Sequence, residues 1–280
     1  MLKNKIDFAL VFTVKDANPN GDPLNGNRPR ENYEGYGEVS DVCLKRKIRN
    51  RLQDAGFSIF VQSDDRSDDG YKSLSERAAG AEELKTAGKD REAYARAACA
   101  RWMDVRTFGQ VFAFKSKDTK GVSVGVRGPV SIHSAVSLEP VNITSMQITK
   151  SVNSEPGERK SADTMGMKHT VDYGVYVTYG SINVQLAEKT GFSDDDAEAV
   201  KQALISLFEN DSSSARPDGS MEVYKVIWWK HNCPGGQYSS AKVHRTLKVS
   251  KKREEPRTVQ DYDIYVEPLE GLEAEIYDGV

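Results

Sequence analysis

The stretch IDFALVFTV at residues 6–14 decides the fold class of this chain. Large apolar side chains alternate in it with smaller or polar ones, which is the pattern of a β-strand with one strongly apolar face. The sequence NPNGDP at residues 18–23 then gives a dense turn signal, because Asn, Pro, Gly and Asp favour the backbone angles of turns. From there to residue 39 no apolar period is present, so we predict a strand followed by an ordered loop.

A helix with a basic surface is predicted after this loop. Ser40 is a good N-cap, and Leu44 and Ile48 recur at helical spacing. Residues 45–51 contain no acid, and their cations are Lys45, Arg46, Lys47, Arg49 and Arg51. Lys45 and Arg49 are four residues apart and should share the outer face of the helix. There they could contact phosphate groups without reading sequence, or simply face water.

The rest of the chain alternates between helical and strand-like segments. Residues 73–102 read as helical, and Ser73 with Glu76 forms a capping box. Strand character is expected at residues 57–61, 122–136, 171–186 and 222–229, and a further helix at residues 193–208. Because strands lie on both sides of the helical block, we predict that it is an insertion. The order of elements predicts an α+β fold of the ferredoxin-like, split βαβ kind.

Composition limits the class of protein. The 280 residues fit one large domain, and a formal net charge of −3 does not by itself indicate a nucleic-acid binder. A binding surface would need segregated charge, as between the basic residues 45–51 and the acidic residues 261–280. The three cysteines are far apart, which favours reduced thiols, and no apolar run is long enough for a membrane span. We expect a cytoplasmic protein with no signal peptide and no membrane partner.

Three further segments could contact a ligand. The loop at residues 18–30 places Arg28 and Arg30 among Gly and Asn residues, which can present donors to phosphates, although an ordinary surface loop is an equal alternative. Arg106 could reach a phosphate, but a structural charge at a helix end is favoured. Residues 149–170 have no apolar period. Such a projection can insert apolar side chains between bases, or it can be a surface loop without function.

Catalytic signals are weak. The histidines are scattered, and His231 with Cys233 has no second ligand pair that would complete a zinc site. No serine-hydrolase, metalloprotease or dinucleotide motif is present. The acids Asp16 and Asp22 lie near the turn-rich loop, where such residues are more often turn formers than bases. We expect no enzyme, no metal and no cofactor.

In combination these segments resemble a known family. The motifs are NPNGDP at residues 18–23 with NRPR at 27–30, SxxxLKR at 40–46 followed by Ile48 and Arg49, DxRxFG at 104–109, and MGMKH at 165–169 with VDYG at 171–174. With these motifs in this order, the chain resembles the backbone subunit of type I CRISPR Cascade complexes, the Cas-seven family of RAMP proteins. The segment NPNGDP points to the type I-C branch. The resemblance covers residues 6–190.

The resemblance implies a fold shaped like an open right hand. Its RRM-like palm would be formed by residues 1–63, 104–148 and 171–280, its helical finger insertion by residues 64–103, and its thumb loop by residues 149–170. The RNA-binding residues expected on this basis are Asn20, Gly21, Arg28, Arg30, Ser40, Lys45, Arg46, Arg49, Arg106, Arg159, Lys160, Met165, Met167, Lys168 and His169.

The resemblance also implies a function in antiviral defence. Such a subunit is non-catalytic, coats the CRISPR guide RNA in several stacked copies, contacts other Cascade subunits, and meets the target DNA strand through the guide. Three alternatives stay open. They are an RNA-cleaving RAMP protein that uses Asp16, Asp22 or His169, a generic single-strand RNA binder, and a scaffold that binds no nucleic acid.

Overall fold

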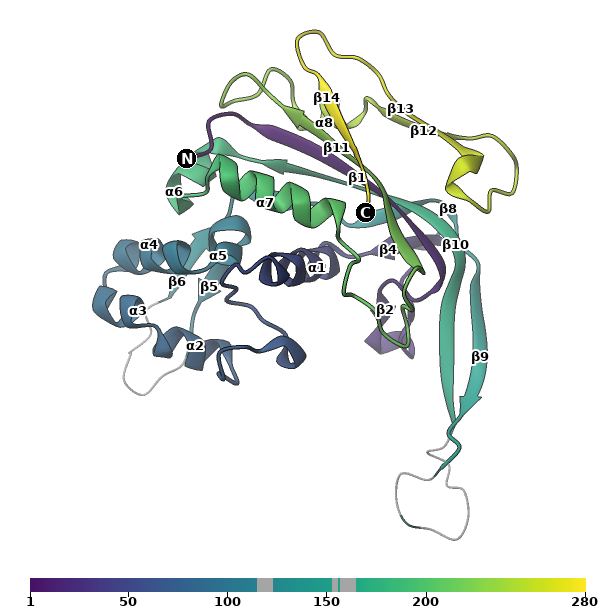
Figure 1. The fold of residues 1–280 in the computed structure, drawn as a ribbon, viewed down its shortest axis with the longest axis horizontal. Helices are drawn as coiled ribbons and strands as arrows, with labels where there is room; N and C mark the ends of the chain where they lie inside the picture. Colours follow the sequence, from purple (N-terminus) through teal and green to yellow (C-terminus); the bar gives the residue numbers. More distant parts are fainter. Residues whose placement is uncertain (115–122, 153–155, 157–164) are drawn as a thin grey trace.

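The computed structural model describes residues 1–114, 123–152, 156 and 165–280. Its main feature is an antiparallel sheet in which β1 (Ile6–Ala17) lies between β10 (Met165–Ile182) and β11 (Met221–Lys230) (Figure 1). The outer strands are β14 (Ala274–Asp278) beside β11, and β8 (Ala135–Pro140) and β4 (Tyr36–Val39) beyond β10. The two ends of β10 pair with β7 (Val130–Ile132) and β9 (Ile143–Thr149).

Strand β1 is buried on both faces of the sheet. Phe8, Leu10 and Phe12 enter the larger hydrophobic core, while Ala9 and Val11 enter a second core on the opposite face. The sequence pattern predicts one apolar face. The small residues between the large ones are buried as well, because both faces of the sheet are covered.

Three helices cover the face with the larger core. They are α1 (Asp41–Asp54), α6 (Val184–Thr190) and α7 (Asp194–Ile205). The side chain of Ser40 accepts from Cys43 N and starts α1, and Ser193 starts α7 with a capping box. The helices predicted to begin after Ser40 and Ser193 are therefore confirmed in place, and the start of α1 lies beside the loop after β1.

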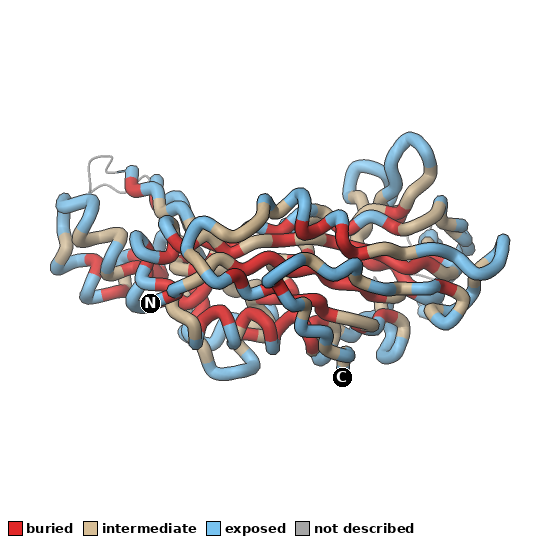
Figure 2. Tube along the Cα trace, turned by 90° about the horizontal axis from the view of Figure 1, so that it is seen from above, coloured by how far each residue is buried: buried red, intermediate tan, exposed pale blue. Residues whose placement is uncertain are grey.

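The opposite face is covered by elements between residues 240 and 266. The covering elements are α8 (Ser240–His244), β12 (Leu247–Lys251) and β13 (Tyr262–Val266), with the short η4 turn (Val259–Asp261) between the two strands. Their apolar side chains form the second core with Ile227 and Trp229 of β11. Figure 2 shows the buried residues running along the central strands, with exposed residues mainly at the periphery.

A separate module, here called the helical module, has its own core. It consists of α2 (Leu74–Gly80), α3 (Glu82–Ala87), α4 (Arg91–Arg101), α5 (Met103–Phe108), β5 (Gly109–Phe112) and β6 (Val124–Arg127). Phe60, Trp102 and Phe112 meet at its centre, with ring centroids 4.6–6.5 Å apart. The predicted helical insertion is present, although β5 and β6 pair with each other and, within the described residues, not with the main sheet.

The prediction of a strand at residues 57–61 is wrong. The N–H groups of Phe60 and Val61 donate to the carboxylate of Asp104, at 2.7 and 3.0 Å, instead of to a neighbouring strand. A short buried apolar run cannot be distinguished from a strand by its pattern alone. The adjoining segment contains the η2 turn (Asp64–Arg66).

Strands β9 and β10 extend beyond the sheet as a two-stranded ribbon (Figure 1). We call residues 143–149 with residues 165–171 the projecting hairpin. The prediction of an irregular loop over residues 149–170 is wrong for Met165–Thr170, which pair in register with Thr144–Thr149. The ribbon lacks an apolar period because it leaves the sheet and both of its faces carry exposed residues.

The mixed α/β architecture with a central antiparallel sheet is confirmed, and the RRM-like detail stays a prediction. Across the described residues, no helix is both long and apolar enough to cross a membrane.

Candidate nucleic-acid interface

The loop that follows β1 is held in one shape by its own side chains. It contains β2 (Gly21–Asp22), the η1 turn (Pro23–Asn25) and β3 (Arg28–Pro29). Asn20 Oδ1 accepts hydrogen bonds from Ser40 N and Ser40 Oγ, both at 2.9 Å. A Cβ atom on Gly21 would lie 2.0 Å from Asn27 Oδ1. Asn20 and Ser40 therefore fix the loop against the start of α1, while Gly21 packs against Asn27 within the loop. The contacts of Asn20, Gly21 and Ser40 with RNA stay predictions.

The two arginines of this loop have different partners. Arg30 Nη2 lies 3.3 Å from Asp22 Oδ1, and the Arg30 side chain is 38% exposed. Arg28 Nη1 donates to Ser145 Oγ at 3.0 Å and so joins the loop to β9. A guanidinium group has five N–H donors, so each arginine keeps donors that a phosphate could accept.

Helix α1 uses most of its cations internally. Arg49 Nε lies 3.0 Å from Asp104 Oδ2, its side chain is only 12% exposed, and its guanidinium carbon lies 4.9 Å from the centre of the Phe108 ring. The prediction that Lys45 and Arg49 share an outer, phosphate-facing surface is wrong for Arg49, because the buried carboxylate of Asp104 binds it. Lys45 pairs with Asp41 at 2.9 Å and is more exposed, at 26%, so it remains a candidate.

Arg46 and Lys47 also have partners within the protein. Arg46 Nη1 donates to Val61 O at 2.6 Å, and burial together with the charge of Arg49 lowers the pKa of Arg46. Lys47 is buried and forms an ion pair with Asp211 in the loop before β11. Burial lowers the pKa of Lys47, and the charge of Asp211 opposes that shift. Lys47 could bind a phosphate only by breaking its ion pair, whereas Arg46 keeps further N–H donors and its predicted contact with RNA stays a prediction.

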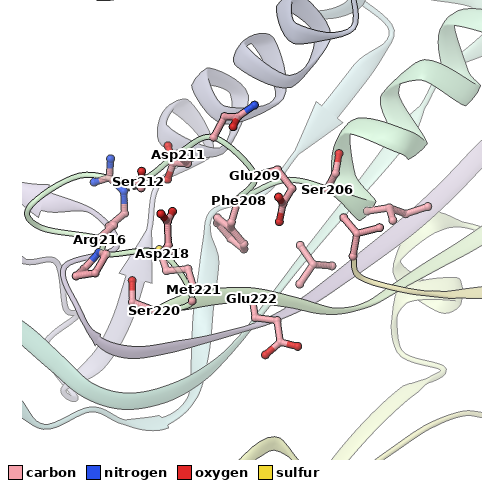
Figure 3. A pocket seen from close by; sticks show the side chains of 16 residues that line it. Ser206, Phe208, Glu209, Asp211, Ser212, Arg216, Asp218, Ser220, Met221 and Glu222 are labelled. Atoms are coloured by element: carbon pink, nitrogen blue, oxygen red, sulfur yellow. Dashed lines mark hydrogen bonds and ion pairs between the residues drawn. The ribbon is translucent and has the colours of Figure 1, made fainter.

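The pocket next to this ion pair is acidic (Figure 3). Its lining includes Glu209, Asp211, Asp218 and Glu222, with Arg216 as a counter-charge. Arg216 Nε is bonded to Asp211 Oδ2 at 3.0 Å. An anionic ligand would meet more carboxylates than cations here, so the pocket does not extend a phosphate-binding surface.

Arg106 is a structural charge. Its guanidinium group binds both oxygens of Asp196, at distances of 2.9–3.1 Å, and Nη1 also donates to Cys99 O. Asp196 in turn accepts from Ser193 N at the start of α7. This bidentate pair joins the helical module to the helices under the sheet, and the predicted contact of Arg106 with RNA stays a prediction.

The projecting hairpin has two different faces. Residues directly opposite each other in the ribbon share a face, and successive residues alternate between faces. One face therefore carries Met165, Met167 and His169 with their partners Thr149, Gln147 and Ser145, and the other carries Lys168 with Met146 and Ile148. Met165 and Met167 are 56% and 55% exposed. Apolar side chains this exposed are suited to contact with bases rather than with a core.

Arg159 and Lys160 lie outside the described residues, so their predicted contacts with RNA stay predictions. Lys168 is half-buried and, within the part of the chain that the structure describes, forms no ion pair. It remains a candidate for contact with phosphate.

Ser145 is the interface residue that sequence reasoning missed. Its Oγ lies 3.0 Å from Arg28 Nη1 and 2.8 Å from His169 Nδ1. These atoms come from β3, β9 and β10, so the loop after β1 and the projecting hairpin form one continuous surface. The alternation in ITSMQIT at residues 143–149 is a strand signal, but only the pairing with β10 places Ser145 opposite His169.

The residues considered for catalysis have different surroundings. Asp22 binds Arg30 and accepts from Leu24 N at 3.2 Å, while Asp16 lies exposed at the end of β1 with a φ of 52°. His169 is bonded to Ser145. Among residues 1–114, 123–152, 156 and 165–280, no group of three or more His, Cys, Asp or Glu side chains could hold a metal ion.

Comparison with known proteins identifies the family. The family model described as "CRISPR-associated protein Cas7" matches residues 4–267. A protein of Haloferax volcanii named CRISPR-associated protein Cas7 is 29% identical over 229 residues, which are 75% of this chain and 66%, just under two thirds, of that relative.

Two solved structures are also similar. One is a chain of a "CRISPR RNA-guided surveillance complex, pre-nicking", with a TM-score of 0.46, 16% identity, and coverage of 80% of this chain and 75% of that chain. The other is a chain of a "CRISPR RNA-guided surveillance complex", with a TM-score of 0.40, 18% identity, and coverage of 80% and 68%. With its family model matched over nearly the whole sequence, the chain belongs to the family of CRISPR-associated protein Cas7.

Proposed function

We propose that this protein binds a CRISPR guide RNA along its backbone and forms, in several stacked copies, the spine of a type I-C Cascade surveillance complex. Its partners would be the guide RNA, further copies of itself, other Cascade subunits and, through the guide, the target DNA strand. The observation that carries the proposal is the continuous surface of the loop after β1 and the projecting hairpin, in a chain of this family. Arginines and exposed methionines together suit an RNA strand.

The parts of the molecule have corresponding roles in this proposal. The sheet with α1 and α7 would be the palm, the helical module the fingers, and the projecting hairpin with the residues that follow it the thumb. Arg28 and Arg30 would contact phosphates, and Met165 and Met167 would insert next to a base of RNA held by a neighbouring copy. Because phosphate contacts carry no sequence information, binding would accept any guide.

We also propose that the subunit does not cleave RNA. Asp22 and His169, two of the three candidate residues, are bonded to Arg30 and Ser145 and contribute to the binding surface. Labelled guide RNA and complementary RNA, incubated with the protein with and without magnesium, should be retained on a filter and stay intact. Specific products that disappear in Asp16→Asn, Asp22→Asn or His169→Gln variants would favour the RNA-cleaving alternative.

The remaining cations of α1 make separate contributions that can be tested. Lys45→Ala should weaken binding of all RNA sequences alike, and the slope of log affinity against log salt concentration should fall by about 0.7, the value for one phosphate neutralised on a single strand. Arg49→Ala should leave that slope unchanged but lower the melting temperature, because it leaves the buried Asp104 without its counter-charge. A lower salt slope in Arg49→Ala would contradict the assignment of Arg49 to the interior.

A further inference from the structure

The hydrogen bonds of Ser145 connect two parts of the candidate surface that are far apart in the sequence. Ser145 lies on β9 and is paired directly with His169 of β10, while Arg28 comes from β3. The projecting hairpin is otherwise a two-stranded ribbon beyond the sheet, and an isolated ribbon of this kind is marginally stable in water. The contact with Arg28 is therefore suited to fix the direction of the hairpin relative to the loop.

The chemistry of the three side chains sets the direction of each hydrogen bond. The Arg28 guanidinium group can only donate, so Ser145 Oγ accepts from it. The hydroxyl hydrogen is then free to be donated to Nδ1 of a neutral His169. This leaves the Nε2–H group of His169 and the other N–H groups of Arg28 as donors, and a surface of donors favours a ligand rich in acceptors, such as an RNA backbone.

We propose that Ser145 is a positioning residue of the RNA-binding surface, which orients Arg28 and His169 toward one stretch of RNA backbone and holds the projecting hairpin beside it. The proposal rests on the proposed function. Ser145 itself need not touch RNA. It acts by ordering the two side chains before binding, which reduces the conformational entropy lost when RNA binds.

The test compares two substitutions in the full-length chain that are isosteric with each other. Ser145→Thr adds a methyl group and keeps the hydroxyl, whereas Ser145→Val adds the same methyl group and replaces the hydroxyl with a second one. Both β-branched residues are favourable in a strand. Fluorescence anisotropy with a labelled guide-length RNA should show Ser145→Val binding about three- to tenfold more weakly, as for the loss of one ordinary hydrogen bond. Ser145→Thr should bind within about twofold of the unchanged protein.

A second measurement separates positioning from direct contact. In an Arg28→Ala, His169→Ala background, Ser145→Val should cause no further loss, because the residues it orients are already gone. In the otherwise unchanged chain, Ser145→Val should also lower the salt slope by about 0.7, because Arg28 no longer neutralises its phosphate. A full further loss in the double-alanine background would show that Ser145 contacts RNA itself and would overturn the positioning role.

Ser131→Val is the matched control. Ser131 is likewise an exposed strand serine with a cross-strand hydroxyl partner, Ser181 at 3.0 Å, but it lies on β7, which pairs with the other end of β10. Its substitution should leave RNA binding unchanged, and thermal melts should show that both valine variants stay folded. Equal binding by Ser145→Val and the unchanged protein would overturn the positioning role of Ser145 but not the proposed function. Absence of RNA binding by the unchanged protein would instead overturn the proposed function.

Discussion

Asp104→Ala should lower the free energy of unfolding by about 3–5 kcal/mol, the range for removing one partner of a buried ion pair. Asp104 is 1% exposed, and its carboxylate accepts from Arg49 Nε, Phe60 N and Val61 N at 2.7–3.0 Å. The substitution leaves a partly buried guanidinium group and two backbone N–H groups without an acceptor. Denaturant unfolding followed by circular dichroism measures the loss.

The matched control for this prediction is an exposed acid with an ion pair. Asp263 is 62% exposed and lies 3.1 Å from Lys252, so Asp263→Ala should change stability by less than about 1 kcal/mol, as expected for surface pairs. Equal effects of the two substitutions would contradict the role of Asp104 as the acceptor that joins the helical module to α1.

Shortening the projecting hairpin should strongly weaken ordered assembly on RNA while sparing the fold. Met146 and Lys168 are paired across the ribbon, so Asn-Gly can replace residues 147–167 as a two-residue hairpin turn. The variant loses Met165 and Met167 but keeps the contacts of Ser145 with Arg28 and His169. An aromatic side chain stacked on a base contributes about 1–3 kcal/mol. If the two methionines contribute a similar amount, assembly should need about five- to 150-fold more protein. Light scattering on a guide-length RNA measures the size of the assemblies.

A comparable change on the opposite face of the sheet serves as the control. Lys251 and Tyr262 are paired at the end of the β12–β13 hairpin, so Asn-Gly can replace residues 252–261 in the same way. This second variant should assemble on RNA like the unchanged protein. If the variant with the shortened projecting hairpin forms full-length assemblies, the assignment of the hairpin as the thumb is contradicted. If that variant is unfolded, the hairpin supports the core.

The elements predicted correctly from sequence are those with local signals. The alternation in β1, the N-caps at Ser40 and Ser193, and the helical spacing in α1 are all present in the structure. Each of these signals depends on residues within one or two turns of one another, or on one strand and its nearest neighbours. For this reason the fold class and the positions of the main helices could be predicted before any contact was known.

The partners of the charged residues could not be predicted in this way. Arg49 binds an acid 55 positions away, and Arg106 binds an acid 90 positions away. A basic stretch has the same sequence whether its cations face RNA or buried carboxylates, and only the tertiary structure distinguishes the two. The same limit applies to Ser145, since its partner Arg28 is 117 positions away.

The projecting hairpin was missed as regular structure for a different reason. A strand is recognised in sequence by alternation between a buried and an exposed face. Residues 165–169 have no buried face, because the ribbon extends beyond the sheet, so the hydrogen bonds with β9 are not reflected in a hydrophobic pattern. Two methionines followed by a lysine and a histidine were the remaining signal, and they indicated contact with a ligand rather than a strand.

The most direct test of guide-RNA binding is the ratio of absorbance at 260 and 280 nm, measured on the protein purified after co-expression with a CRISPR array. We predict a ratio well above that of protein alone. The particles with this ratio should be larger than a single copy of the chain. Treatment with ribonuclease should lower the ratio to that of protein and reduce the particle size. A ratio typical of protein without nucleic acid, unchanged by ribonuclease and found in a particle of one copy, would contradict the proposal.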